Sequence, residues 1–197
     1  FASYRAYYQK WADTWEAQAL LRANPVVGDG DLCQRFAELI DPIRYPAEGL
    51  TAAEVREIRR IKARVDSERL PRGANPNTHL KLGRGGLADV EWTIQLLQLE
   101  HAHHVPGLRT TRTLAAIEAA TEAGLLIQED ADSLTEAWRV VTRIRNGVVL
   151  WRAKPSESMV ETAGDRASLA YLLGIGQDQT EEMVNQYLRV TRRARQV

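Results

Sequence analysis

At 197 residues the chain is long enough to bury one substantial hydrophobic core, and its 44% hydrophobic and 26% charged residues are ordinary for a globular protein. The 26 basic and 26 acidic residues give a formal net charge of zero, which argues against a general nucleic-acid binder. A single cysteine excludes a disulfide within the chain, and no stretch has the pattern of a membrane span or a signal peptide, so we expect a cytoplasmic protein.

The first expected helix covers residues 1–23 and carries an aromatic stripe. Its aromatic residues follow one another at steps of four, three and four: Tyr4, Tyr8, Trp11 and Trp15. A stripe at this spacing lies in a core more often than it stacks on nucleic-acid bases. The helical pattern is already under way at Phe1, which is typical of a segment of a longer protein.

Helical spacing of apolar residues continues along the chain, and the alternation typical of strands is nearly absent. Asp31 can cap the second helix, and Thr51 with Glu54 forms a capping box before the third. We expect breaks at Pro42 and Pro46. After the first helix, the expected helices are residues 31–40, 51–70, 86–103, 110–123, 129–153, 165–173 and 178–195. The prediction is an all-α fold, a helical bundle of about seven to eight helices with no substantial sheet.

The most informative segment runs from Lys81 to Trp92. Three glycines directly precede the helix that starts there: Gly83, Gly85 and Gly86. A helix start of this kind presents free N–H groups and the positive end of the helix dipole, which favour an anion. Lys81 and Arg84 add positive charge, and Asp89 and Glu91 lie in the first turns. The alternative is a glycine-rich cap whose acids satisfy the helix N-terminus, since the pattern is neither a Walker loop nor a dinucleotide fingerprint.

A second candidate is the run of cations between residues 56 and 84, which holds nine basic residues and three acidic ones. Arg56, Arg60 and Arg64 share a helix face at steps of four. One hypothesis is a solvated face with ion pairs. The other is a positively charged wall for nucleotide phosphates or an acidic partner, because the guanidinium group binds such oxygens in pairs.

Three weaker signals carry no site prediction. Asp29 and Asp31 lie in a turn, whereas paired metal-binding aspartates need a rigid strand. Cys33 has no neighbour that would make it a nucleophile. The histidines near one helix end, where the helix dipole favours them, are His101, His103 and His104. The sequence therefore predicts no catalytic residue and no metal site in this chain.

Several stretches together resemble a known family. Residues 7–8, 15–16, 19–23 and 27–29 resemble the helix that closes the nucleotidyltransferase domain of glutamine synthetase adenylyltransferases. Residues 68–73, 81–92 and 108–114 resemble the helical domain that follows. The similarity covers nearly the whole chain and is greatest to the C-terminal, adenylylating half of the bifunctional actinobacterial enzyme.

The resemblance implies that residues 1–50 are the helical tail of an upstream nucleotidyltransferase domain and that residues 51–197 are a C-terminal helical bundle domain. It implies a parent enzyme that uses ATP and Mg²⁺ to adenylylate glutamine synthetase, and in its other half deadenylylates it, to control nitrogen assimilation. The implied partners are glutamine synthetase, a PII signal protein and the upstream domain. The family's Asp-x-Asp motif is absent, so this fragment is expected to be inactive alone and to bind no cofactor.

By the same resemblance, Trp15, Glu16 and Arg22 border a nucleotide cleft from one side. The residues that approach it from the other side are Lys81, Arg84, Gly85, Gly86, Asp89 and Glu91. The arginine face adds Arg60 and Arg64 as nucleotide-binding or partner-binding candidates. Three alternatives stay open: a non-catalytic module that docks glutamine synthetase or a PII protein, the equivalent domain of a related uridylyltransferase, and a nucleic-acid-binding bundle.

Overall fold

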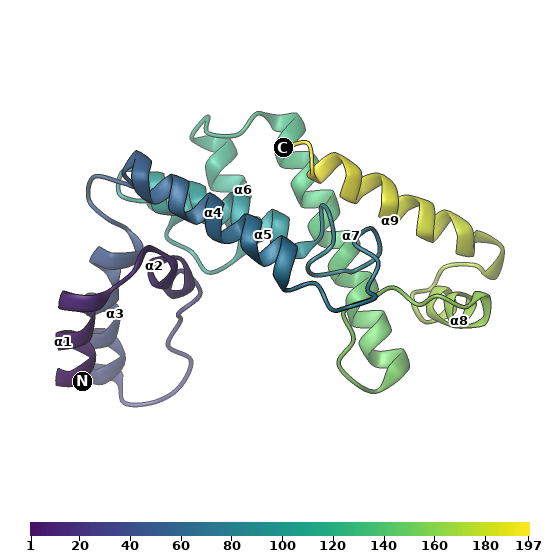
Figure 1. Ribbon diagram of the computed structural model, residues 1–197, viewed down its shortest axis with the longest axis horizontal. Coiled ribbons are helices and arrows are strands. Elements are labelled where there is room, and N and C mark those ends of the chain that lie inside the picture. The colour runs from purple at the N-terminus through teal and green to yellow at the C-terminus, as the bar shows by residue number, and fades with distance from the viewer. The chain divides into compact units, whose positions relative to one another are not determined.

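The computed structural model describes residues 1–197, apart from the side chain of Gln177. Over these described residues the fold is all-α, with nine α-helices and no sheet (Figure 1). The elements are α1 (Ala2–Trp11), α2 (Thr14–Leu20), α3 (Gly30–Arg44), α4 (Ala52–Glu68), α5 (Leu87–His101), the 3₁₀ helix η1 (Pro106–Leu108), α6 (Thr113–Glu122), α7 (Gln128–Arg152), α8 (Ala163–Leu172), the 3₁₀ helix η2 (Gln177–Gln179) and α9 (Thr180–Ala194). The all-α class is confirmed, and the expected count of seven to eight helices is too low.

The additional helix arises because the expected first helix is divided in two. Asp13 has an extended backbone between α1 and α2, and its N–H donates to Oε2 of Glu16 at 3.0 Å. This is one half of a capping box, a motif that starts a new helix. The local signal for a helix start at Asp13 therefore overrides the apolar spacing that continues across it.

The second helix also differs from its expected bounds. Asp29, rather than Asp31, is its N-cap, because Oδ1 of Asp29 accepts a hydrogen bond from the Leu32 N–H at 2.8 Å. The helix continues through Pro42 to Arg44, so the expected break at Pro42 is wrong. Proline removes only one N–H donor there, and the final turn is still closed by the Tyr45 N–H bonding to the Asp41 carbonyl. The Thr51–Glu54 capping box is confirmed, with both of its hydrogen bonds present.

The chain forms two compact units, of which the first comprises residues 1–63 and 93–126. Within it Gln18 donates to Gln95 at 2.8 Å, which ties α2 to α5. The buried amide of Gln98 donates to the carbonyls of Leu108 and Thr110, both at 2.7 Å. Long-range bonds between side chains and the backbone thus hold the turn that precedes α6. The domain boundary near residue 50 stays a prediction.

The second unit comprises residues 64–92 and 127–197. In it α7 packs against α8 and α9, which Figure 1 shows as the green and yellow helices. Gly147 allows the close contact with α8, because a Cβ there would lie 2.8 Å from Cδ1 of Leu169. The fully buried side chains at the centre of this unit are Leu80, Val141, Val148, Val160, Leu169 and Tyr187.

The N-terminal aromatic stripe is not part of a core in this structure. None of the residues of α1 is buried, and Tyr4, Trp11 and Trp15 are 57%, 63% and 51% exposed. The expectation of a buried stripe is therefore wrong for this chain. Among the described helices, none combines the length and apolar composition that a membrane span requires.

Candidate functional site

The glycine-rich segment forms a closed loop in which the backbone amides from Leu82 to Asp89 all donate within the chain. The Leu82 N–H donates to Nδ1 of His79 at 3.0 Å, and the Gly85 N–H donates to Oδ2 of Asp89 at 2.6 Å. The remaining amides donate to carbonyls at 2.8–3.1 Å; they are those of Gly83, Arg84, Gly86, Leu87, Ala88 and Asp89. The expectation of free amides for an anion is therefore wrong, and the helix start is a glycine-rich cap.

The glycines are required by close backbone packing. Gly85 has a φ of +69°, a conformation that favours glycine, and a Cβ there would overlap the carbonyl oxygen of Thr191 in α9. A Cβ on Gly83 would overlap the carbonyl of His79, and one on Gly86 would lie 2.8 Å from the carbonyl of Leu80. The sequence signal that indicated an anion site instead reports the contact between this loop and α9.

The charged residues of the segment fall into two groups. Lys81 and Arg84 are exposed, so their charges are available to a partner. Asp89 and Glu91 are half-buried, and Asp89 is used by the loop itself as the acceptor for Gly85. The structure thus brings Lys81, Arg84 and the two glycines together at one loop. Asp89, as the acceptor for the Gly85 N–H, has a structural role.

A second segment of the chain holds this loop in place. The Leu80 N–H donates to the carbonyl of Glu157 at 2.6 Å, and the Met159 N–H donates to the carbonyl of Thr78 at 2.9 Å. The Glu157 carboxylate in turn accepts two hydrogen bonds from Arg145 of α7, at 2.7 and 2.6 Å. The loop is therefore anchored through residues 157–159 to the longest helix.

Two pKa shifts follow from this anchor. The hydrogen bonds from Arg145 stabilise the charged carboxylate and lower the pKa of Glu157. Burial lowers the pKa of His79, which is 4% exposed and whose Nδ1 must be unprotonated to accept from Leu82. Both groups favour the folded loop in the protonation states that prevail near neutral pH.

The candidates near the N-terminus lie in the first unit. Glu16 accepts hydrogen bonds from the Tyr7 hydroxyl at 2.8 Å and from the Asp13 N–H, and the bond from Tyr7 raises the pKa of that tyrosine. Arg22 is exposed and donates to the hydroxyl of Thr113 at 3.3 Å. Trp15 is exposed beside Glu16 on α2. Glu16 and Arg22 thus take part in structural contacts, and Trp15 and Arg22 are exposed.

The arginine face of α4 consists mainly of solvated ion pairs. Two nitrogens of Arg60, Nε and Nη2, donate to Glu57 at 3.0 and 2.8 Å. Arg64 lies 3.7 Å from Glu68. All of these pairs follow helical spacing of three or four residues. The structure therefore supports the hypothesis of a solvated face for Arg60 and Arg64, while their binding roles stay predictions.

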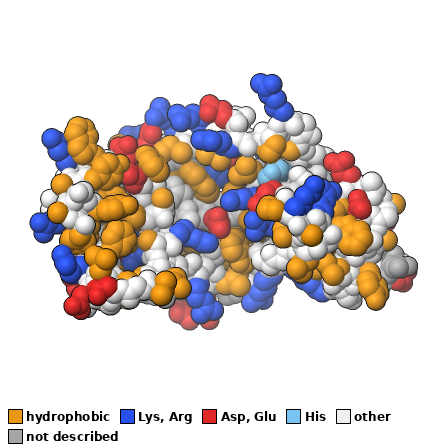
Figure 2. Space-filling model, turned by 90° about the horizontal axis from the view of Figure 1, so that it is seen from below, with side chains coloured by type: hydrophobic (Ala, Val, Ile, Leu, Met, Phe, Trp, Pro, Cys, Tyr) orange, Lys and Arg blue, Asp and Glu red, His pale blue; other side chains and the backbone are white. Residues whose placement is uncertain are grey.

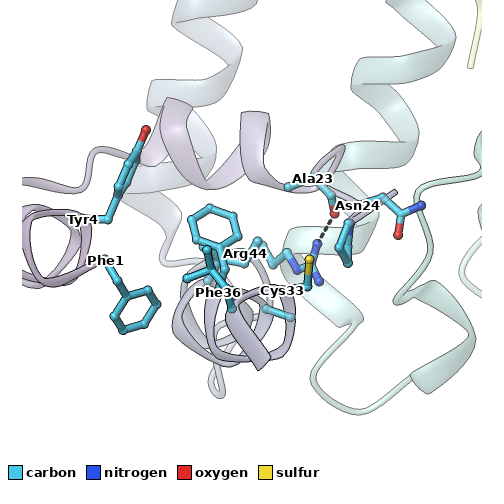
Figure 3. A pocket seen from close by; sticks show the side chains of 11 residues that line it. Phe1, Tyr4, Ala23, Asn24, Cys33, Phe36 and Arg44 are labelled. Atoms are coloured by element: carbon cyan, nitrogen blue, oxygen red, sulfur yellow. Dashed lines mark hydrogen bonds between the residues drawn. The ribbon is translucent and has the colours of Figure 1, made fainter. Parts of the chain in front are cut away.

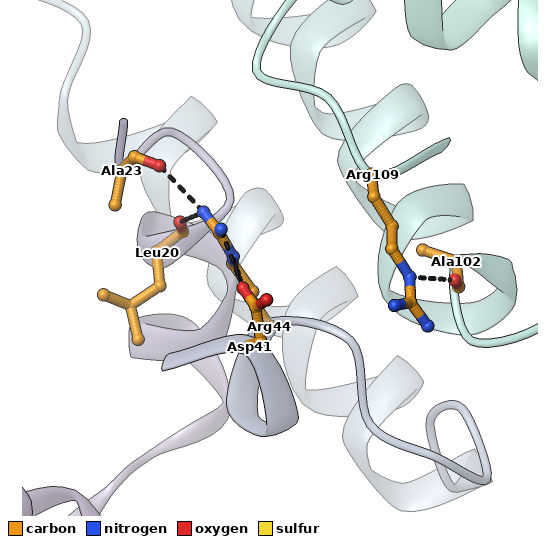
Figure 4. A network of polar contacts seen from close by, with 6 residues as sticks. All are labelled: Leu20, Ala23, Asp41, Arg44, Ala102 and Arg109. Atoms are coloured by element: carbon orange, nitrogen blue, oxygen red, sulfur yellow. Dashed lines mark hydrogen bonds and ion pairs between the residues drawn. The ribbon is translucent and has the colours of Figure 1, made fainter. Parts of the chain in front are cut away.

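An apolar pocket of about 520 Å³ lies between α1, α3 and the segment after α2 (Figure 3). The rings of Tyr4 and Phe36 line it, together with Cys33 of α3. Arg44 closes one wall, but its donors are taken by Asp41 and by the carbonyls of Leu20 and Ala23 (Figure 4). The pocket thus offers apolar surface and no unpaired arginine donor, which fits apolar side chains.

The histidines near the end of α5 contact one another. Nδ1 of His104 lies 2.9 Å from Nε2 of His103, a direct contact between rings. Within the described part of the chain, no group of three or more His, Cys, Asp or Glu side chains could hold a metal ion. Asp29, as the N-cap of α3, has the structural role of a helix-capping residue.

Sequence reasoning missed two exposed arginines at the end of α9. Arg192 and Arg195 lie next to Thr191, the residue that Gly85 contacts. A signal for them exists in the sequence, because residues 183–197 contain four arginines and no acidic residue. The contact that brings them to the glycine loop is visible only in the structure.

Over the described residues the fold is all-α, and two family models match parts of the chain. Residues 55–197 match the family model described as GlnD PII-uridylyltransferase, and residues 1–39 match that described as glutamate-ammonia ligase adenylyltransferase. A bifunctional glutamine synthetase adenylyltransferase/adenylyl-removing enzyme of Mycobacterium avium (strain 104) is 56% identical over 100% of this chain and 20% of that protein. Proteins with the same name from Streptomyces avermitilis and Mycobacterium tuberculosis H37Rv are 57% and 53% identical over 99% of this chain and 20% of their lengths.

The model that matches residues 55–197 covers more than half of the chain, so the chain belongs to the family that this model describes, and over its whole length it is similar to bifunctional glutamine synthetase adenylyltransferase/adenylyl-removing enzymes. It spans about a fifth of the length of the relatives that it matches.

Proposed function

We propose that this chain is a segment of an enzyme that adenylylates and deadenylylates glutamine synthetase. In this proposal it joins the end of a nucleotidyltransferase domain to the helical domain behind it. The observation that carries the proposal is the succession of two family matches, over residues 1–39 and 55–197, within one chain that is similar throughout to such enzymes. The enzyme is cytoplasmic in this proposal, and a PII protein is its regulatory partner.

The exposed aromatic face of α1 supports this arrangement. A helix whose tyrosines and tryptophans are largely exposed gains little from hydrophobic burial, which is the main source of helix stability in proteins. In the proposal, the remainder of the nucleotidyltransferase domain covers this face. The adjoining apolar pocket would receive side chains of that domain.

ATP and Mg²⁺ belong to the proposed parent reaction. When bound, Mg²⁺ neutralises the triphosphate and orients it for transfer. The residues of this chain do not fit a Mg²⁺ site, because no suitable group of ligands occurs among those that the structure describes. We therefore assign the chemistry to other parts of the enzyme, and to this chain a supporting role at the nucleotide or target site.

A second role, the docking of glutamine synthetase or a PII protein, is favoured by the loop geometry. The amides that would bind a phosphate are all occupied, whereas Lys81 and Arg84 remain exposed. Exposed cations on a rigid loop suit a protein surface at least as well as a nucleotide.

The experiment uses the longer enzyme that contains this chain and the double variant Lys81→Ala/Arg84→Ala. Transfer of AMP from radiolabelled ATP to glutamine synthetase is measured together with co-sedimentation of the two proteins. The control is Arg152→Ala/Lys154→Ala, which removes two exposed cations from the end of α7.

A raised KM for ATP with unchanged co-sedimentation supports the nucleotide role, and the opposite result supports docking. If both properties match those of the control, neither role belongs to these residues. An unaltered enzyme that transfers UMP to a PII protein, and no AMP to glutamine synthetase, would overturn the proposed function in favour of uridylyl transfer.

A further inference from the structure

The C-terminal end of α9 and the glycine-rich loop meet at one point of the second unit. Gly85 approaches the backbone of Thr191 so closely that any side chain at residue 85 would overlap it. The Arg195 N–H donates to the same Thr191 carbonyl at 3.1 Å, so the last turn of α9 is closed at this contact. Arg84 and Arg192 adjoin these two contacting residues in the sequence, so their backbones are close in space as well.

The four arginines of this end of α9 divide into two pairs. Arg189 lies 3.5 Å from Glu182 and Arg193 lies 3.3 Å from Glu136, so both have acidic neighbours in the chain. Arg192 and Arg195 are exposed, stand three residues apart and have no acidic partner within ion-pair distance among the residues that the structure describes. A helix C-terminus is stabilised by nearby cations, but the paired arginines already supply that charge.

Arg84 adds a third exposed guanidinium from the loop. Its own N–H is bonded to the Pro76 carbonyl at 2.8 Å, and the flanking amides of Gly83 and Gly85 are bonded too. The backbone that carries Arg84 is thus already ordered, which reduces the conformational entropy lost when the side chain binds a partner.

We propose that Arg84, Arg192 and Arg195 form a docking surface for an acidic segment of a partner protein. Arginine suits this role because its planar guanidinium binds a carboxylate through two parallel hydrogen bonds. Three such groups, without acidic partners in the described part of the chain, provide the charge complementarity that an Asp- or Glu-rich segment requires. We call these three residues the arginine surface.

A protein segment fits this surface better than a nucleic acid does. Binding of a duplex typically neutralises many phosphates along an extended basic track. Here the surface consists of three arginines, one on the loop and two at one helix end, and the residues near the start of the same helix include the acids Glu181 and Glu182. In Figure 2, basic and acidic side chains are interspersed over the face in view.

The inference goes beyond the proposed function, because it concerns association and does not depend on adenylyl transfer. The 197-residue chain is tested with a fluorescently labelled oligoglutamate peptide, whose anisotropy reports binding at low and moderate salt. Two matched double variants of α9 are compared: Arg192→Gln/Arg195→Gln and Arg189→Gln/Arg193→Gln. Each removes two arginines from the same helix end, and Arg84→Gln is added to the first as a triple variant.

We expect the Arg192→Gln/Arg195→Gln variant to bind the peptide about tenfold more weakly, and the triple variant more weakly still, because each lost guanidinium removes a charge-assisted pair. The Arg189→Gln/Arg193→Gln control should stay near the affinity of the unaltered chain. Equal losses in the two double variants, or no binding by the unaltered chain, would overturn the proposal. So would tighter binding of a labelled RNA duplex through the same arginines. The proposed function is tested separately, by an adenylylation assay of the proposed longer enzyme, so failure of one proposal can be distinguished from failure of the other.

Discussion

The helices at the two ends of the chain bury their apolar faces to very different extents. Helices α7 to α9 enclose a cluster in which Val148, Leu169 and Tyr187 are wholly buried. Helix α1 has an equally clear aromatic stripe, yet none of its residues is buried. An amphipathic pattern therefore predicts a helix and the face that wants burial, but it does not reveal whether the partner of that face lies in the same chain.

The largest loss of stability is expected at the contact between the glycine loop and α9, in the region of α7 to α9. Gly85→Ala should lower the free energy of unfolding by at least about 3 kcal/mol, because it adds overlap with Thr191 to an unfavourable φ. The control Gly73→Ala also has a positive φ but has open space around its Cβ position, so it should cost about 1–2 kcal/mol. Urea denaturation measures both variants, and equal losses would show that α9 does not press on residue 85.

The anchor of the loop comes next in size. Glu157→Gln should cost about 1–2 kcal/mol at neutral pH, a value kept small because both partners are about one-third exposed. The folded pKa of Glu157 is lowered, so its contribution is complete above the unfolded pKa near 4.3 and disappears as pH falls through the folded pKa. Denaturation at a series of acidic pH values should show a slope that the variant lacks. If the variant shows the same dependence of stability on pH as the unaltered chain, the ion pair of Glu157 with Arg145 does not stabilise the fold.

The His79 contact should produce an effect in a higher pH range, because burial favours the neutral imidazole. Because burial lowers the folded pKa of His79, its contribution is complete above the unfolded pKa near 6.5 and is lost as pH falls below that value. His79→Asn does not titrate and keeps an acceptor for the Leu82 N–H. Stability of the unaltered chain should therefore decline between neutral and mildly acidic pH, whereas that of the variant should stay level.

A gain in stability is expected within the core. The hydroxyl of Tyr187 is buried and has no hydrogen-bond partner in the described structure, and burial raises its pKa. Tyr187→Phe removes that unsatisfied group and should raise the free energy of unfolding by about 1 kcal/mol. A loss of similar size would show that the hydroxyl has a partner, such as a buried water.

The smallest effect on the unfolding free energy of this chain is expected in α1, whose aromatic face is exposed. Trp11→Gln should change its unfolding free energy by no more than about 0.5 kcal/mol, since Trp11 is 63% exposed. Trp138→Gln in α7, where the ring packs on the core cluster, should cost about 2 kcal/mol and serves as the contrast. In the proposed longer enzyme, Trp11→Gln should be destabilising. If it changes the stability of that enzyme as little as it changes the stability of this chain, the aromatic face of α1 is not covered there.

Much of the fold could be predicted from local signals. The bounds of α7 and the Thr51–Glu54 capping box follow from apolar spacing and capping chemistry within a few residues. The division at Asp13 does not follow from the apolar spacing, which continues across the short capping motif there. The site was harder to predict, because the same three glycines suit an anion-binding helix start and a close backbone crossing. The hydrogen bonds that occupy the loop amides, and the contact of Gly85 with Thr191 about a hundred residues away in the sequence, distinguish the two.

Hydrogen exchange of the backbone amides tests most directly whether the open and closed regions differ as the structure indicates. In the 197-residue chain, the amides of α1 should exchange fast, while those of α7 and α9 are protected close to the level of global unfolding. In the longer enzyme, α1 should gain protection as its aromatic face is covered. Protection of α1 equal to that of α9 in the 197-residue chain would contradict the account.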